Sequence, residues 1–252
     1  MRKLLVLVAT VALTFVLAAP ASANHSWGKY HWARTSNPFT LKLGDNVSTA
    51  WDSYLSTASG DWTNAPPLDT TIVAGAGLTG CGPVSGRVEV CNANYGNNGW
   101  LGVATIWIFF GKHITQGTVK VNDFYFDQTY YNDTNAKQHV MCQEVGHTFG
   151  LAHQRSATSH SCMDDQNGLK DPTFAHPNQH DYDQLVTIYS HTDGYTTVTS
   201  ASLSTKHPAG GSEDDDAVPA GAGPQHGKVF VKDLGGGRLV ISFVIWATQG
   251  EP

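Results

Sequence analysis

The stretch Gln143-Glu144-Val145-Gly146-His147-Thr148-Phe149-Gly150-Leu151-Ala152-His153 carries the most informative chemistry in this 252-residue sequence. We expect a helix from about residue 136 to residue 150. At about 100° per residue, position 147 lies only about 40° round such a helix from position 143, so Gln143 and His147 share one face. Glu144 lies on the flank of that face. This spacing predicts that the face binds a metal ion, with a carboxylate close enough to reach a metal-bound water.

The end of the predicted helix brings a third ligand to the same place. Gly150 readily adopts the left-handed conformation that ends helices, and the chain can then turn back so that His153 reaches the ion. Zinc lowers the pKa of its bound water to about 7, and a neighbouring carboxylate can take a proton as that water attacks a carbonyl. The stretch therefore predicts a Zn²⁺ site formed by His147, His153 and Gln143, with Glu144 as the general base.

This pattern resembles the extended zinc motif H-E-x-x-H-x-x-G-x-x-H of the metzincin metalloproteases. Ten residues past His153, the sequence Ser161-Cys162-Met163-Asp164 is similar to the Met-turn of that superfamily, and the short interval looks most like the matrixins, the matrix metalloproteinase-like branch. The runs 181–189 and 99–104 resemble the closing helix and the cleft-lining edge strand of matrixins. The resemblance covers about residues 39–191. It implies a metzincin-like twisted mixed β-sheet packed on helices, and a secreted zinc endopeptidase that acts on protein or peptide substrates.

Gln143 departs from this family pattern, because it stands where the motif has its first histidine. An amide oxygen is a neutral and weaker zinc donor than an imidazole nitrogen. Gln143 completes a working site, or His139 or His160 takes its place, or zinc binds poorly. In the last case the chain is a non-catalytic secreted binding protein on a degenerate metzincin scaffold. A metal-dependent hydrolase of another bond, such as an amide in a cell-wall polymer, also stays open, although Met163 disfavours it.

The N-terminus has the pattern of a secretory signal peptide. Two basic residues precede the apolar run Leu4–Ala19, and Ala21-Ser22-Ala23 follows as a small-residue cleavage site. A run of about 16 apolar residues is short for a membrane-spanning helix. We therefore expect cleavage after Ala23 and an extracellular protein without a stable membrane anchor. Matrixins usually carry a pro-segment whose cysteine blocks the zinc. Residues 24–38 contain no cysteine, so we expect no latency of that kind.

All four cysteines follow the expected cleavage site. An oxidising compartment favours two disulfides, and four cysteines allow three connectivities. A Cys81–Cys91 bond would close a short loop, and a Cys142–Cys162 bond would then tie the predicted metal helix to the loop before Met163. The cysteines lack the C-x-x-C spacing of a cysteine-rich zinc site.

The remaining patterns predict an α+β fold with α/β-type layers. Strands are expected at 39–43, 71–74, 87–91, 101–110 and 118–126, and helices at 47–58, capped by Asp45 or Asn46, and at 179–189. A Gly-, Pro- and acid-rich stretch then precedes a β-hairpin at 229–234 and 239–246, which must dock on another surface because an isolated hairpin is barely stable. The expected divisions are a signal peptide at 1–23, a lead-in at 24–38, the protease-like domain at 39–192, a linker at 193–227 and the hairpin segment at 228–252.

The composition excludes two classes of function. Charged residues make up 14% of the chain and the net charge is −6, which argues against a long disordered chain and against a nucleic-acid-binding protein. We expect a monomer. The acidic run Glu213–Asp216 fits a solvated linker better than a structural Ca²⁺ site, and we interpret His176, His180 and His191 as surface residues.

Overall fold

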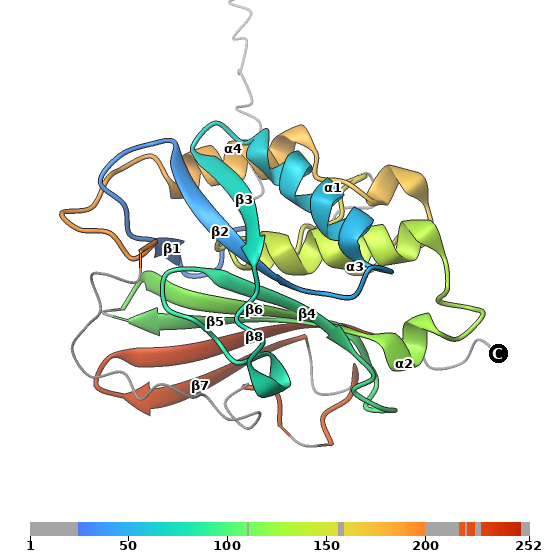
Figure 1. The fold of residues 1–252 in the computed structure, drawn as a ribbon. Helices are drawn as coiled ribbons and strands as arrows, with labels where there is room; N and C mark the ends of the chain where they lie inside the picture. The colour runs from blue at the N-terminus through green and yellow to red at the C-terminus, as the bar shows by residue number, and fades with distance from the viewer. Residues whose placement is uncertain are drawn as a thin grey trace, which may run out of the picture.

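The computed structural model describes residues 25–109, 111–155, 159–199, 217–219, 221–224 and 228–247. In Figure 1 a twisted mixed sheet lies below helices α1, α3 and α4. The predicted fold class, a twisted mixed sheet packed against helices with a C-terminal hairpin, is confirmed. The predicted signal peptide and the acidic run 213–216 lie outside the described residues.

The described strands form one eight-stranded sheet in the order β3-β2-β4-β6-β5-β8-β7, with β1 paired to the start of β6. Strands β1, β2, β3, β4 and β6 pair in parallel, whereas β5, β8 and β7 continue the sheet with antiparallel pairs. The strands span His31–Trp32 (β1), Phe39–Asn46 (β2), Leu68–Ala74 (β3), Val88–Ala93 (β4), Trp100–Phe109 (β5), His113–Asn122 (β6), Val229–Gly235 (β7) and Arg238–Trp246 (β8).

The first helix begins later than the sequence predicts. Helix α1 spans Asp52–Thr63 rather than 47–58. Strand β2 stays paired with β3 and β4 as far as Asp45 and Asn46, so these two residues are strand residues and not helix caps. Pairing on both edges of β2 therefore outweighs the local capping preference, and the buried face of α1 is provided by Leu55, Ala58 and Trp62.

Side-chain caps begin the other helices. Asn122 accepts a hydrogen bond from the Phe124 amide, so residues 123–126 form α2 (Asp123–Phe126) where a continuing strand was predicted. Asp133 caps α3 (Thr134–His147) by accepting from two backbone amides, and Asn178 forms a capping box with Asp181 at the start of α4 (Gln179–Ile188). Gly150 has a φ of +95°, as predicted, but α3 ends three residues earlier, at His147.

The C-terminal hairpin is part of the main sheet. Strand β8 pairs with β5 from Trp100 opposite Trp246 to Ile108 opposite Leu239. Its inward-facing residues Ile241, Phe243 and Ile245 belong to the same apolar core as α1 and α3. Pairing with β5 and packing into the main core thus give the hairpin the stability that an isolated hairpin lacks.

Two other outlying segments also pack on the domain. In the lead-in, Trp32 is fully buried and its indole nitrogen donates to the Thr148 carbonyl, 2.9 Å away. Residues 193–197, which lie in the predicted linker, pair with this segment, because the Asp193 amide donates to the Arg34 carbonyl and the Thr197 amide to the Ala33 carbonyl, each at 2.8 Å. The two segments therefore brace each other beside β6.

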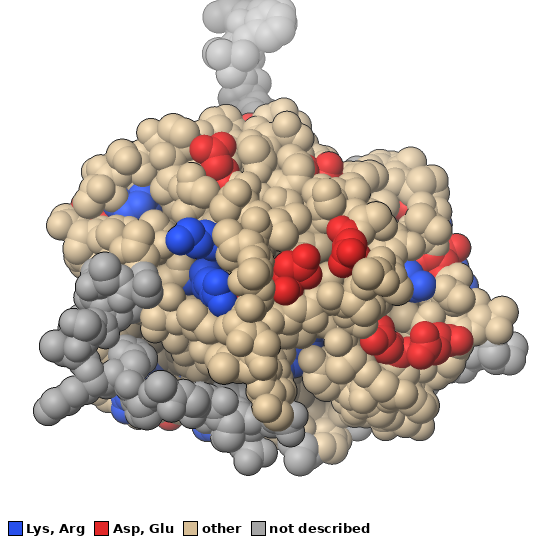
Figure 2. Space-filling view, in the orientation of Figure 1, with Lys and Arg blue, Asp and Glu red and all other residues tan. Residues whose placement is uncertain are grey.

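The described surface is sparsely charged. On the face shown in Figure 2, the Lys and Arg side chains and the Asp and Glu side chains form small separate groups on an otherwise uncharged surface. Among the described residues, no helix combines the length and the apolar character needed to cross a membrane.

Candidate metal centre and its cover

Helix α3 is polar in sequence and buried in the fold. Its side chains from Gln138 to His147 are all buried, although five of them are polar or ionisable. The helix lies between α1 and the strands β5, β6 and β8. Burying polar groups costs free energy unless they find partners, so this helix must meet either hydrogen-bonding groups or an ion.

The structure brings together the two predicted histidine ligands. The Nε2 atoms of His147 and His153 are 3.1 Å apart, and the rings are nearly perpendicular. Two imidazole nitrogens bound to one tetrahedral zinc ion, each about 2.05 Å from it, would be separated by about 3.3 Å. The observed separation fits that geometry.

The other ring nitrogens of these histidines contact groups behind the pair. His147 Nδ1 is 2.9 Å from the Leu151 carbonyl oxygen, which can only accept, so Nδ1 donates and Nε2 keeps its lone pair. His153 Nδ1 is 3.3 Å from the Asp165 carboxylate and accepts from Arg155 Nη2 at 3.4 Å, so His153 Nε2 can donate to His147 Nε2. With a cation between the rings, a proton on His153 Nδ1 directed at Asp165 would leave both Nε2 lone pairs for the ion. A carbonyl or carboxylate behind each ring is the usual support of metal-binding histidines.

Asp165 is the buried anion behind His153. Arg155 and Lys228 each place a nitrogen 3.0 Å from its Oδ2 atom, and its side chain is fully buried. Burial alone would raise the pKa of this carboxyl group, but the hydrogen bond from Arg155, the neighbouring His153 and the contact with Lys228 together hold the pKa far below its usual value. Asp165 therefore stays ionised, and its charge suits a proton on His153 Nδ1.

Gln143 and Glu144 are fully buried without hydrogen-bond partners. Neither amide atom of Gln143 and neither carboxylate oxygen of Glu144 is satisfied. Burial raises the pKa of Glu144 well above its usual value, and the nearby backbone amides of Ala104 and Ile245, which lack the geometry of full hydrogen bonds to it, offset only part of this. Unsatisfied buried groups are rare in native proteins and call for an explanation. A cation held by Gln143 Oε1 and the two histidines, with a water beside Glu144, would supply the missing partners.

Close approach of β5 to α3 depends on a glycine. A Cβ atom at Gly102 would lie 2.7 Å from Glu144 Oε1 and 2.6 Å from Val140 Cγ1. Any larger residue would push the strand away from the carboxylate. Gly102 lies in the run 99–104 that resembles the cleft-lining strand, so this strand is positioned directly against the predicted base.

The turn that contains Met163 lies against the metal helix. The structure contains the Cys142–Cys162 and Cys81–Cys91 disulfides, and the first joins the residue before Gln143 to the residue before Met163. Met163 is fully buried, and a Cβ atom at Gly146 would approach its sulfur to 2.7 Å. The Met163 amide donates to Ser161 Oγ, and Ser161 donates in turn to Asp181 on α4.

Strand β8 covers the two histidines. The Phe243 ring stacks on the His147 ring, with centroids 4.2 Å apart and planes 7° from parallel, and it meets His153 edge-on. Phe243 is opposite Ala104 of β5 in the sheet register. His147 and Glu144 are consequently fully buried beneath a strand of their own chain.

The two substitutes considered for Gln143 contact other groups. His139 is buried, and its Nε2 donates to the Asp164 carbonyl, 3.0 Å away. His160 lies against Phe174 and its Nδ1 is 3.1 Å from the Thr173 hydroxyl. These two side chains are therefore engaged elsewhere, and Gln143 lies one turn before His147 on α3.

Sequence reasoning missed several residues that shape the site. Phe243 and Lys228 come from the hairpin, and no local pattern indicates that they contact α3 or Asp165. Two further groups of histidine and aspartate also converge among the described residues, His25 with His180 and Asp181, and His31 with His113 and Asp193. Each group combines segments that lie 80 residues or more apart in the chain, so no motif spacing exists that could have identified either group.

Comparison with known proteins adds little. No protein-family model matches the sequence, and no curated protein matches it. Among solved structures, one described as "Structure of myroilysin" is similar over 64% of this chain and 97% of that chain, with 11% sequence identity and a TM-score of 0.36. Likeness at that distance says nothing about activity, and the side chains alone carry the inference.

Proposed function

We propose that this chain is an exported zinc-dependent endopeptidase that the structure describes in a covered form. The observation that carries the proposal is the pair of imidazole nitrogens 3.1 Å apart beside a buried carboxylate without partners. The resemblance of residues 143–153 and Met163 to the matrixin pattern, and the two disulfides of a chain expected to be exported, support it.

Each side chain has a distinct task in this proposal. His147 Nε2, His153 Nε2 and Gln143 Oε1 would hold the ion. When bound, zinc supplies a Lewis acid and lowers the pKa of a bound water to about 7. Glu144 would accept a proton from the attacking water on a carboxylate oxygen and pass it to the leaving amine. Burial raises the pKa of Glu144, which suits a group that must hold this proton near neutral pH.

A peptide substrate would take the position that β8 now holds. An extended peptide can bind a sheet by adding a strand to its edge. Strand β5 lies directly against Glu144 at Gly102, and its outer edge is paired with β8. Substrate binding therefore requires β8 to leave β5. We propose that the hairpin is an internal cover of the site, and that cutting the chain within the Gly-, Pro- and acid-rich stretch before residue 217 uncovers it.

The decisive experiment removes the base and leaves the ligands. In chain cut before residue 217, Glu144→Gln should lower hydrolysis of a casein-derived peptide library by about 10²- to 10⁴-fold, while zinc content per chain is unchanged. Glu89→Gln is the matched control, because Glu89 is also buried but lies in β4 and pairs with Arg87. Equal hydrolysis by the cut Glu144 variant and the cut parent would contradict the proposed role.

A second candidate function is favoured by the cover itself. A fully buried Glu144 and a strand seated on the histidines also suit a non-catalytic exported binding protein that keeps the scaffold. The two candidates separate cleanly. If the cut chain binds zinc and cleaves no peptide in the library, the binding protein is the better description.

A further inference from the structure

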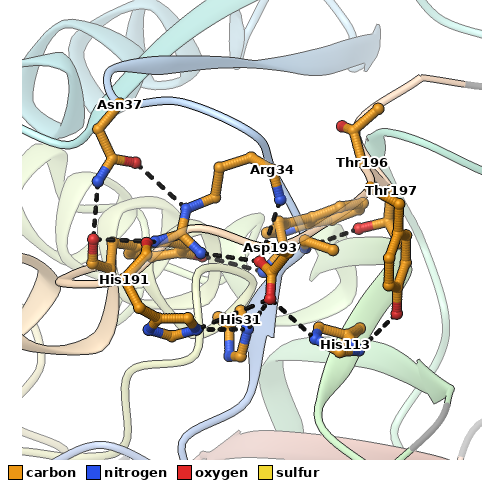
Figure 3. A network of polar contacts seen from close by, with 12 residues as sticks. His31, Arg34, Asn37, His113, His191, Asp193, Thr196 and Thr197 are labelled. Carbon is orange, nitrogen blue, oxygen red and sulfur yellow. Dashed lines mark hydrogen bonds and ion pairs between the residues drawn. The ribbon is translucent and has the colours of Figure 1, made fainter.

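Four metal-binding side chains converge far from α3 along the chain. His31 lies in β1, His113 begins β6, and His191 and Asp193 follow α4; Figure 3 shows the three rings turned toward Asp193. Asp193 Oδ1 is 3.2 Å from His113 Nε2, 3.6 Å from His31 Nε2 and 3.8 Å from His191 Nε2. The Nε2 atoms of His31 and His191 are 3.1 Å apart. Donors on one tetrahedral zinc ion are about 3.3 Å apart. Of these four side chains, only His31, His113 and Asp193 bring their donor atoms all within 4.8 Å of one another, so the exposed ring of His191 would have to turn toward His113 to join them.

The contacts on the outer side of the group leave these four atoms for a ligand. His31 Nδ1 is 2.8 Å from the Lys29 carbonyl, so it donates there and His31 Nε2 keeps its lone pair. His113 Nδ1 is 2.7 Å from the Tyr195 hydroxyl. The other carboxylate oxygen, Asp193 Oδ2, accepts from the Arg34 guanidinium at 3.0 Å and from the Arg34 amide at 3.2 Å. Each of these contacts orients a donor atom toward the common centre.

Hydrogen bonds can hold the group together without an ion. Among the ring nitrogens, His191 can donate to the lone pair of His31 Nε2, and His113 can donate to Asp193 Oδ1. His31 Nε2 nevertheless lies 3.6 Å from the negatively charged Asp193 Oδ1 without donating to it, and a cation at the centre would bind both atoms.

We propose that His31, His113, His191 and Asp193 bind a structural Zn²⁺ ion. Three imidazoles and a carboxylate are ligands that zinc prefers, and four protein ligands close its tetrahedral shell. His31 and His191 line a surface pocket of about 320 Å³, so the ion can enter the folded protein from solvent. The ion would join β1, β6 and the segment after α4, which are otherwise tied by the Arg34–Asp193 ion pair.

Metal content and stability test this site independently of peptidase activity. Full-length oxidised protein is loaded with Zn²⁺, dialysed and assayed for zinc by elemental analysis. The parent should contain two zinc ions per chain, and His191→Asn and the double variant His113→Ala/His191→Ala should each contain one. His176→Asn is the matched control, because the His176 side chain is as exposed as that of His191, 50% against 49%, and pairs with Asp61 instead. It should keep both ions.

Further variants separate this site from the one on α3. The double variant His147→Ala/His153→Ala should retain one ion, and adding His191→Asn should remove it. If the α3 site binds no zinc and the site beside β1 does, the parent contains one ion, and His191→Asn removes it. If the parent contains one ion that His147→Ala/His153→Ala removes and His191→Asn spares, the present proposal is wrong.

A spectroscopic measurement covers the case in which a variant folds poorly. With Co²⁺ in place of zinc, the α3 double variant should show the visible absorption of tetrahedral cobalt, and His191→Cys should shift that band because a thiolate replaces an imidazole. The unfolding temperature of the α3 double variant should rise with added Zn²⁺. No Co²⁺ band and no zinc-dependent stabilisation in that variant would overturn the site.

Discussion

The two histidine groups use similar donors and differ in how many the protein supplies. At the end of α3, two imidazole nitrogens face each other, the side chains of Gln143 and Glu144 are buried without hydrogen-bond partners, and β8 lies over the histidines. Beside β1, three imidazoles and a carboxylate provide four donors next to a surface pocket. Catalytic zinc sites keep one position open, whereas structural sites are filled by protein ligands. On the two proposals above, the number of protein ligands, and not burial, separates a reactive zinc site from a structural one.

Releasing β8 should have the largest effect on peptidase activity, because it uncovers the histidines at the end of α3. It leaves the histidine group beside β1 intact. A recognition sequence for a site-specific protease placed within residues 208–213 allows the full-length chain to be cut. We expect at least about a hundredfold gain in peptide hydrolysis after cutting and dilution, which corresponds to uncovering a site that is more than 99% covered, or about 2.7 kcal/mol. Initial rates before and after cutting measure this gain.

A disulfide across β5 and β8 provides the control for that experiment. Thr105 and Ser242 are directly opposite each other, and their hydroxyl groups are 2.8 Å apart. The double variant Thr105→Cys/Ser242→Cys should hold the hairpin in place, so cutting should no longer raise activity. Equal activity of the uncut parent, the cut parent and the cross-linked chain would show that β8 does not block the substrate.

Acid should destabilise the fold through the buried side of α3. Burial lowers the pKa of His139 to about 4, whereas an unfolded histidine has a pKa of 6.5. Below pH 6.5 the unfolded chain binds this proton first, so the free energy of unfolding falls as the pH drops from 6.5 toward 4. The loss should be on the order of 2 kcal/mol at pH 4.5.

A substitution isolates this histidine. His139→Gln keeps a donor for the Asp164 carbonyl but does not titrate, so urea unfolding at pH 7 and pH 4.5 should differ by about 2 kcal/mol less than in the parent. His176→Gln, at an exposed position, should leave the difference unchanged. If the free energy of unfolding of the His139 variant depends on pH as strongly as that of the parent, His139 is not the cause of the acid destabilisation.

The smallest expected effect comes from adding a third imidazole to the group on α3, so that it has as many imidazoles as the group beside β1. Gln143→His adds a third imidazole, which should tighten zinc binding at this site by about tenfold or more, or about 1.4 kcal/mol. Chelator competition in the His191→Asn background measures the α3 site alone. Gln138→His places the same side chain elsewhere on α3 and should have no such effect. An unchanged affinity in Gln143→His would mean that position 143 does not contact the ion.

The sequence predicted the parts of the fold that depend on local pattern. The helix spacing placed Gln143 and His147 on one face of α3, alternation located β2, and short strand-like runs located β3 and β4 to within a few residues. Asp133 and Asn178 begin α3 and α4 by caps that act within three residues, a local signal that went unused. The start of α1 was wrong because strand pairing, a non-local interaction, overrode the local preference.

The cover and the second histidine group depend on contacts that no local pattern encodes. Ala104 and Phe243 are neighbours across β5 and β8 although 139 positions separate them, and His31 meets His191 across 160. His191 is exposed, as expected of a surface residue, yet its Nε2 atom lies close to His31 and Asp193. Neither hydropathy nor spacing distinguishes such a histidine from a solvated one.

Asp165 has a consequence for how the cover and the ion act on each other. One buried carboxylate contacts His153 and also Lys228 at the start of the hairpin, while Phe243 stacks on His147. Two binding events that share contacts in this way are thermodynamically linked, and the linkage is reciprocal. If bound zinc changes the affinity of the hairpin for the domain by some factor, the docked hairpin changes the affinity of the site for zinc by the same factor. Removing zinc with a chelator should therefore change how tightly the hairpin binds, and cutting the chain should change how tightly zinc binds.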